Sequence, residues 1–177
     1  IDAVSGDKLL GGPQCGIIAG RRALVDAMRR NPLLRALRVD KLTIAALAAT
    51  LALYIEPGRL EAIPFFAMLA VTPEALRLRA DAMSAALQGA AGAHVEAVET
   101  EAAVGGGSLP TASIPSAAIA VEPRGCSVED LAAFLRRSRP PIVGRADGER
   151  LLIDLRTVMP SEDAAIVCAI LAAPACG

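Results

Sequence analysis

The sequence predicts an α/β chain that ends in a small α+β domain with an antiparallel sheet. The chain has 177 residues, of which 54% are hydrophobic, and this is enough to bury a core. Helix start signals and helical apolar spacing dominate residues 21–90. Strand-like and helical segments follow after Gly92 in the order β, β, α, β, β, α, which is typical of a compact α+β domain.

The first residues predict a strand, a glycine-rich turn and a second short strand. The second strand covers the apolar residues 16–20, and the turn before it contains Gly6, Gly11, Gly12 and Pro13. Residues 21–31 have the pattern of a helix that ends before Pro32.

A long apolar run over residues 42–55 predicts the next helix. Asp40 is suited to cap its N-terminus, and Pro57-Gly58 is suited to end it. The run has about 14 residues, whereas a bilayer span needs roughly 20. We therefore expect a buried helix and no membrane partner, and nothing at the N-terminus resembles a signal peptide.

Thr72-Pro73-Glu74 predicts a further helix, because proline is favoured at the first helical position. One face of this helix presents an apolar row, and the helix is expected to stop near Gly89–Gly92. The row consists of Leu76, Ala80, Met83 and Leu87.

The last part of the chain alternates strands and helices. Strands are expected at residues 94–104 and 116–121, and then at 142–145 and 151–155 around an Asp147-Gly148 hairpin. Ser127-Val-Glu-Asp130 has the form of a capping box and starts an amphipathic helix. A final helix opens at residues 161–163.

Composition excludes several classes of function. A net charge of −1 with 21% charged residues fits neither a disordered tail nor a module that holds nucleic acid by bulk positive charge. Aromatic residues make up only 2% of the chain, so no base-stacking platform is expected.

The cysteines include no CxxC pair, and His94 is the single histidine. We therefore expect no metal site and reduced cysteines in a cytoplasmic protein; they are Cys15, Cys126, Cys168 and Cys176.

Lysine usage points to a candidate catalytic residue. Of the 18 basic residues only Lys8 and Lys41 are lysines. An arginine stays protonated, whereas a lysine amine can lose its proton and attack a carbonyl carbon. Lys8 lies in the glycine-rich turn three residues after Ser5, where backbone N–H groups and a hydroxyl can bind a phosphate. These features suit a Schiff-base lysine beside a phosphate site, but an exposed turn lysine fits them as well.

A second group of basic residues follows the first predicted helix. Five positive charges occur between Arg29 and Lys41, with Asp40 as the one acid among them. Arg35 and Arg38 are three residues apart, so they share a face if this stretch is helical. Two guanidinium groups on one pocket suit a phosphate-like anion, although a solvated helix face is equally compatible with the pattern. The run Gly105–Gly107 before Ser108 is a weaker indication of a ligand loop.

Four stretches of the sequence resemble a known family, the bacterial L-seryl-tRNA(Sec) selenium transferases. The lysine segment Ser5-Gly-Asp-Lys-Leu-Leu-Gly-Gly-Pro-Gln14 is similar to their pyridoxal-lysine motif. Three further stretches agree in order, over most of the chain from Ser5 to Val158. They are residues 31–41, residues 105–110, and residues 140–145 with 151–157.

The resemblance implies the C-terminal part of a fold-type I pyridoxal phosphate-dependent transferase. Residues 1–58 would end the large cofactor domain, residues 59–92 would form connecting helices, and residues 93–177 would form the small α+β domain. Lys8 would bind pyridoxal phosphate as a Schiff base, and Ser5 would help to hold its phosphate. Arg35 and Arg38 would bind selenophosphate.

The implied reaction is a β-replacement that converts seryl-tRNA(Sec) to selenocysteinyl-tRNA(Sec) through a dehydroalanyl intermediate. Many related enzymes bind a substrate carboxylate with the residue at the position of Arg145. The seryl carboxyl is esterified to tRNA here, so the resemblance implies Arg145 only as a doubtful substrate contact. Cys15 stands where relatives are expected to have alanine, and it is expected to pack as a small apolar residue.

The resemblance also places other functional parts upstream of the lysine, including the acidic partner of the cofactor ring and the tRNA-binding region. The 177 residues alone are therefore expected to be inactive, and the resemblance implies a homo-oligomer. Two alternatives stay open: another fold-type I enzyme, such as an ammonia-lyase or aldolase of a small amino or sugar acid, and a non-catalytic α+β interaction module.

Overall fold

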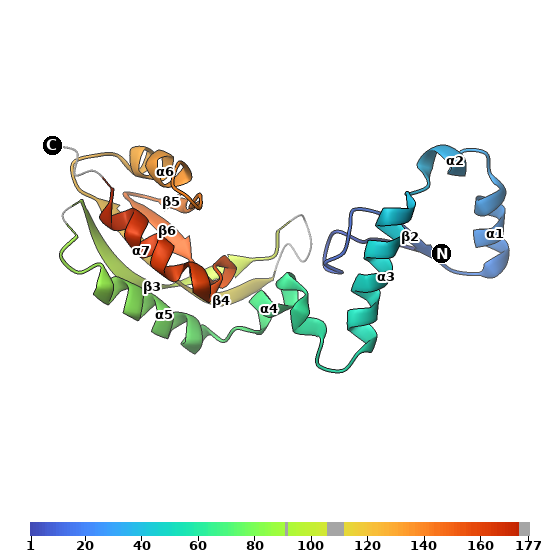
Figure 1. Ribbon diagram of the computed structural model, residues 1–177, viewed down its shortest axis with the longest axis horizontal. Helices are drawn as coiled ribbons and strands as arrows, with labels where there is room; N and C mark the ends of the chain where they lie inside the picture. Colours follow the sequence, from blue (N-terminus) through green and yellow to red (C-terminus); the bar gives the residue numbers. More distant parts are fainter. Residues whose placement is uncertain (91, 106–111, 174–177) are drawn as a thin grey trace. The chain divides into compact units, whose positions relative to one another are not determined.

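The computed structural model describes residues 1–90, 92–105 and 112–173 (Figure 1). The chain divides into two compact units. The first comprises Ile1–Ala70 and Gly105, and the second contains Val71–Val104 and the described residues 112–173. The loop predicted at residues 105–110 falls outside the described residues beyond Gly105, as does Cys176.

The first unit combines a two-stranded antiparallel ribbon with helices. Ser5 pairs with Gly16 and Asp2 with Ala19, so the glycine-rich turn closes the ribbon as the sequence predicts. The elements are β1 (Asp2–Ser5), β2 (Gly16–Ala19), α1 (Arg22–Arg30), α2 (Leu34–Leu37), α3 (Lys41–Ile55), the 3-10 turn η1 (Leu60–Ala62) and α4 (Pro64–Ala70). Both η1 and α4 lie within residues 59–92, where connecting helices are expected, but their separate bounds are not predicted.

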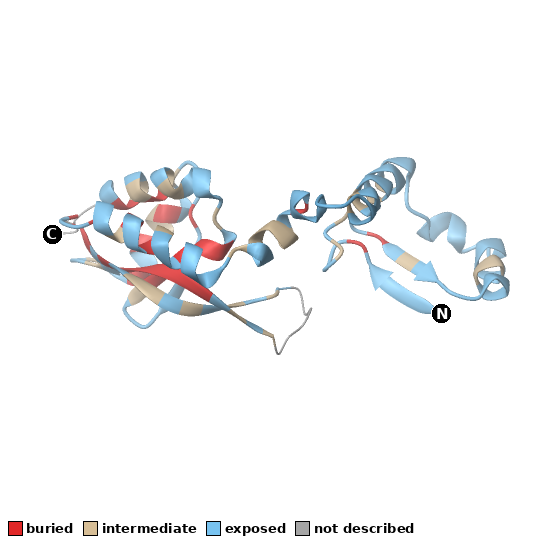
Figure 2. Cartoon of the chain, turned by 90° about the horizontal axis from the view of Figure 1, so that it is seen from below, coloured by how far each residue is buried: buried red, intermediate tan, exposed pale blue. Residues whose placement is uncertain are grey.

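Helix α3 corrects one prediction. Asp40 caps it as expected, because its carboxylate accepts hydrogen bonds from the backbone N–H groups of Leu42 and Thr43 at 2.7 and 3.0 Å. The helix is not buried, however: none of its residues is, and the side chains of Leu42 and Ile55 are 74% and 83% exposed. An apolar run predicts where a helix forms, but burial depends on what packs against it, and the first unit buries only Gly6, Cys15 and Ile63 (Figure 2).

The second unit is the predicted α+β domain together with the helix that precedes it. Its antiparallel sheet has the strand order β3-β4-β6-β5. The elements are α5 (Pro73–Ala86), β3 (Ala93–Ala103), β4 (Ser113–Pro123), α6 (Val128–Arg136), β5 (Arg145–Asp147), β6 (Arg150–Asp154), the 3-10 turns η2 (Leu155–Thr157) and η3 (Pro160–Glu162), and α7 (Asp163–Leu171).

The core of the second unit lies between one face of the sheet and its helices (Figure 2). Alternate residues of β4 and β6 point into it, as the period of a strand requires. The apolar row predicted on α5 is buried there too, so α5 belongs to this core. The largest fully buried side chains are Leu76, Leu87, Ile119, Leu135, Leu151, Ile153, Leu155, Ile170 and Val121.

The bounds of all four strands of this sheet differ from the predicted ranges, and the first strand of the hairpin shares only one residue with its prediction. The strand expected at residues 142–145 is Arg145–Asp147, and Ile142 instead lies buried beside α6, with its N–H donating to Leu135 O at 3.0 Å. The hairpin is present, but Asp147 pairs with Arg150, so Gly148 and Glu149 form its loop. Gly148 has a φ of +60°, which a two-residue hairpin turn of this kind requires.

Candidate functional site

Lys8 lies on a turn whose backbone is held by hydrogen bonds. The N–H of Gly6 donates to Cys15 O and that of Gly12 to Gly6 O, both at 2.8 Å, and the N–H of Gly11 donates to Lys8 O at 3.0 Å. Lys8 itself is exposed. The turn therefore presents a solvent-accessible primary amine on a backbone that is fixed on both sides of it.

Two glycines of the turn cannot be replaced without displacing neighbours. A Cβ atom on Gly6 would lie 2.6 Å from both Cys15 Sγ and Pro13 O. Gly11 has a φ of +70°, and a Cβ atom there would clash with Ile63 Cγ2. Cys15 is buried against this backbone and packs as a small apolar residue, as expected.

Helix α3 supports the turn through residues that the sequence analysis did not single out. The hydroxyl of Tyr54 donates to Leu10 O at 2.8 Å, and its partial burial raises the pKa of Tyr54. The ring of Tyr54 meets that of Phe66 edge-on, with 5.7 Å between centroids. Tyr54 is the only tyrosine of the chain and sits in an apolar helix, which is the one indication that its hydroxyl has a specific partner.

Ser5 and Asp7 interact directly beside Lys8. The Ser5 hydroxyl donates to Asp7 Oδ1. This bond, together with the nearby positive charge of Lys8, holds the pKa of Asp7 below its usual value. A hydroxyl has one proton to donate, so Ser5 can bind a phosphate oxygen only by releasing Asp7.

Arg35 and Arg38 come together at an open cleft of about 1080 Å³ within the first unit. The helix that positions them is short: α2 contains Arg35, and Arg38 is its C-terminal cap. Neither Ser5 nor Lys8 lines this cleft. The lining residues are Gly16, Ile18, Met28, Asn31, Leu33, Leu34, Arg35, Leu37, Arg38, Val39, Asp40, Lys41 and Ile44.

Arg145 belongs to the second unit and its guanidinium group already has partners. It crosses from the edge strand β5 to β3, where it donates to Thr100 Oγ1 and, at 3.3 Å, to Glu101 O. These bonds give Arg145 a structural role within the sheet.

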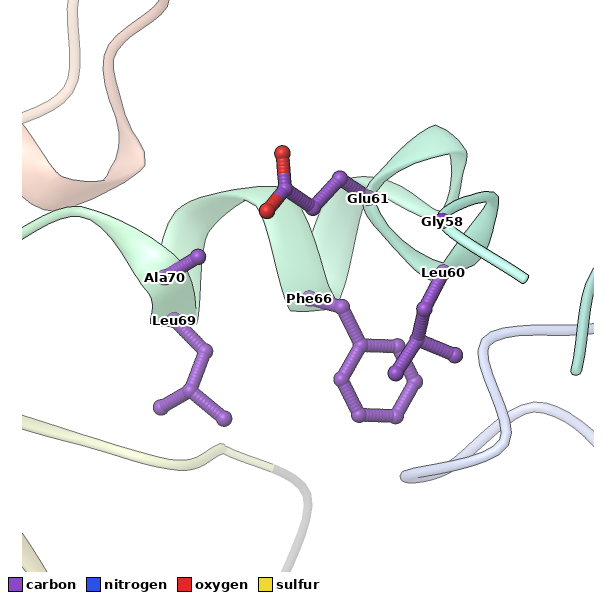
Figure 3. A pocket seen from close by; sticks show the side chains of 6 residues that line it. All are labelled: Gly58, Leu60, Glu61, Phe66, Leu69 and Ala70. Atoms are coloured by element: carbon purple, nitrogen blue, oxygen red, sulfur yellow. The ribbon is translucent and has the colours of Figure 1, made fainter.

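A smaller pocket of about 270 Å³ lies around α4. Leu60 and Phe66 point the same way into it, and the carboxylate of Glu61 points away from them (Figure 3). Its lining is apolar apart from Glu61, so it brings together no set of reactive groups.

The described residues contain no group of three or more His, Cys, Asp or Glu side chains that could hold a metal ion. Among them, too, no helix is long and apolar enough to cross a bilayer.

Fold and site together define an α/β chain with a fixed lysine-bearing turn and a cationic cleft in the same unit. Comparison with known proteins shows the family of the chain. The family model of L-seryl-tRNA selenium transferase (SelA) matches residues 1–159. The chain therefore belongs to the L-seryl-tRNA selenium transferase family.

Individual relatives give the same result. The L-seryl-tRNA(Sec) selenium transferase of Moorella thermoacetica is 48% identical over 161 residues, which is 89% of this chain and 34% of the relative. That of Geobacter sulfurreducens is 43% identical over 169 residues, 94% of this chain and 37% of the relative. That of Aquifex aeolicus is 44% identical over 160 residues, which is 89% of this chain and 35% of the relative. The chain thus spans about a third of the length of these relatives.

Proposed function

We propose that this chain forms part of an enzyme that converts seryl-tRNA(Sec) to selenocysteinyl-tRNA(Sec), with selenophosphate as the selenium donor. The family match over residues 1–159 carries this proposal, and the geometry around Lys8 and the arginine cleft supports it. The proposed enzyme has the fold-type I architecture, works as a homo-oligomer in the cytoplasm, and contacts the tRNA mainly outside these residues.

The residues of the lysine turn fit pyridoxal phosphate as the cofactor. The amine of Lys8 is accessible, the Ser5 hydroxyl stands three residues before it, and Gly6 and Gly11 keep the backbone in a path that a side chain would block. When bound, the cofactor supplies an electron sink for chemistry at the seryl α-carbon. Lys8 would hold it covalently, and the amine of Lys8, once freed by the substrate, would remove and return the seryl α-proton. Ser5 would release Asp7 and donate its hydrogen bond to the phosphate.

Arg35 and Arg38 bind the selenium donor in this account. Their guanidinium groups form charge-assisted, forked hydrogen bonds of the kind that phosphate-like anions accept. Arg145 stays only a candidate substrate contact, because it would first have to release Thr100 and Glu101.

The proposal is tested in an enzyme of the relatives' full length that carries this sequence. Lys8→Ala should reduce the formation of selenocysteinyl-tRNA by at least roughly a thousandfold, since it removes both the covalent link and the proton carrier. Arg35→Ala and Arg38→Ala should raise the KM for selenophosphate more than the KM for seryl-tRNA. The 177-residue chain by itself should form no product. Full activity of the Lys8 variant would overturn the proposal.

A further inference from the structure

We propose that Lys41 is a third cation of the cleft that Arg35 and Arg38 line. Its positive charge offsets the negative charge of Asp40 and makes the cleft specific for a doubly charged phosphate-like anion. This inference rests on the proposed function, because it takes the cleft lined by Arg35 and Arg38 as the place where the selenium donor binds. Lys41 lines the same cleft as both arginines. It is also one of only two lysines in the chain, the other being Lys8.

Asp40 places a permanent negative charge on the lining of this cleft. Its carboxylate caps α3 and accepts hydrogen bonds from the N–H groups of Leu42 and Thr43 and, at 3.1 Å, from the Thr43 hydroxyl. These bonds hold the pKa of Asp40 below its usual value. The carboxylate is therefore ionised at neutral pH and is committed to the helix end.

The capping of α3 also determines which groups can meet an anion. Asp40 already occupies two of the N–H groups at the start of the helix, so positive side chains have to provide the attraction. Lys41 is the first residue of α3, which fixes the position of its backbone beside the cleft.

The three cations of the cleft are available to a ligand. Over residues 1–90, 92–105 and 112–173, no ion pair joins Arg35, Arg38 or Lys41 to an acidic side chain. Arg22 and Arg29 of the neighbouring helix α1, by contrast, both pair with Asp26.

Charge matching then indicates why Lys41 is needed. With Arg35 and Arg38 alone, Asp40 would leave the cleft a single net positive charge. Lys41 raises this to two, and phosphate-type groups carry roughly two negative charges at neutral pH. Lys41 thus makes the cleft prefer a dianion over a singly charged anion.

The test uses an enzyme of the relatives' full length that carries this sequence. Three quantities are measured for each variant: the dissociation constant of inorganic phosphate by calorimetry, the KM for selenophosphate and the KM for seryl-tRNA. Lys41→Gln should raise the first two about tenfold and leave the KM for seryl-tRNA unchanged. Lys41→Arg should keep the phosphate dissociation constant and the KM for selenophosphate within about threefold of the parent values, because it keeps the positive charge.

Two further variants separate charge from structure. Asp40→Asn keeps a good helix cap but removes the negative charge, so phosphate should bind more tightly, and the double variant with Lys41→Gln should return close to the parent. Arg30→Gln removes a cation of the same unit that does not line the cleft, and it should change none of the three constants.

The outcomes distinguish this inference from the proposed function. If Lys41→Gln leaves phosphate binding unchanged while Arg35→Gln and Arg38→Gln weaken it, the inference is wrong and the donor site stands. If none of the three variants weakens phosphate binding, the donor site itself is wrong. If Lys41→Arg fails to restore binding, or Arg30→Gln weakens it as much as Lys41→Gln does, charge at position 41 of the cleft is not what matters.

Discussion

The Ser5 hydroxyl is the smallest feature on which the account of the lysine turn depends. Its single proton goes to Asp7 in this structure, and a bound phosphate would compete for it. The pair thus couples the charge state of Asp7 to the occupancy of the phosphate position.

Ser5→Ala should raise the pKa of Asp7 toward its ordinary value of 3.8, because the hydrogen bond from Ser5 is the largest cause of its lowering. A carboxyl pKa that is lower in the folded chain stabilises the fold above the unfolded-state pKa, and this contribution is lost as the pH falls through the folded-state value. As the pH falls from the unfolded-state pKa of Asp7 to its folded-state pKa, the Ser5 variant should therefore lose less stability than the parent. An NMR pH titration of the carboxyl carbons measures the shift.

Asp40 serves as the internal control for this titration. Its pKa is lowered by the N–H groups of Thr43 and Leu42, which the Ser5 substitution leaves in place. An Asp7 midpoint that does not move in the variant, or one that moves together with that of Asp40, would contradict the assignment.

Tyr54→Phe should loosen the lysine turn without disturbing the second unit. The change removes the hydrogen bond from the hydroxyl to Leu10 O but keeps the ring that meets Phe66. The expected result is faster hydrogen exchange at the amides of Gly11 and Gly12, with a loss of stability of about 1 kcal/mol or less. Unchanged exchange at both amides would show that the turn does not need this support.

At the scale of elements, α6 shows how far local sequence determines structure. The Ser127 hydroxyl accepts a hydrogen bond from the N–H of Asp130 at 3.1 Å, and the Asp130 carboxylate accepts one from the backbone N–H of Ser127 at 3.4 Å, so the predicted capping box is confirmed. Ser127→Ala should lower the free energy of unfolding by about 1 kcal/mol, and Ser127→Asn should restore most of it. Chemical denaturation measures both; equal stability of parent and alanine variant would refute a stabilising cap.

An ion pair that sequence analysis did not foresee joins α5 to α7. Arg79 binds Asp163 through two bonds of 2.6 and 3.0 Å, and it also donates to the carbonyl oxygens of Leu155 and Val158 at 3.3 and 3.0 Å. The two side chains are only 18% and 24% exposed. Arg79 therefore fastens two helices to the turn that follows β6.

Arg79→Leu should destabilise the second unit by about 2 kcal/mol or more, since it leaves Asp163 and two carbonyl groups without this donor. Arg77→Leu is the matched control on the same helix, because its pair with Asp81 is 44% and 51% exposed, and exposed pairs of this kind contribute about 0.5 kcal/mol or less. Thermal or urea unfolding of both variants makes the comparison, and equal losses would contradict the special role of Arg79.

The elements that sequence could predict are those whose determinants are local. Asp40, Thr72 and Ser127 cap their helices with their own side chains, and an alternating strand pattern predicts its own buried face. The Arg79 and Arg145 contacts join residues distant in sequence, so no local pattern reveals them. The same holds for Tyr54, whose partner Leu10 lies 44 residues away.

The candidate site divides in the same way. A rare lysine in a glycine-rich turn and two arginines three residues apart are visible in the sequence, and the structure places both arginines at one cleft. The support of the turn by α3 and the position of Lys41 in the cleft required the fold.

At the scale of the molecule, burial is divided unequally between the two units. The second unit contains the extended hydrophobic core, whereas the apolar side chains of the first, apart from Cys15 and Ile63, are exposed or only half-buried (Figure 2). We expect amides of β4 and β6 to exchange hydrogen slowly and those of α3 to exchange much faster in the 177-residue chain, because local stability follows buried apolar contacts. Equal protection of α3 and β4 by mass spectrometry would contradict this division.

The most direct test of the central claim is to reduce the full-length enzyme carrying this sequence with borohydride and to map its peptides. A reduced Schiff base between pyridoxal phosphate and the chain should appear on Lys8 alone, and Lys8→Ala should abolish it. A pyridoxyl adduct on Lys41 or on any other residue, with Lys8 unmodified, would contradict the account.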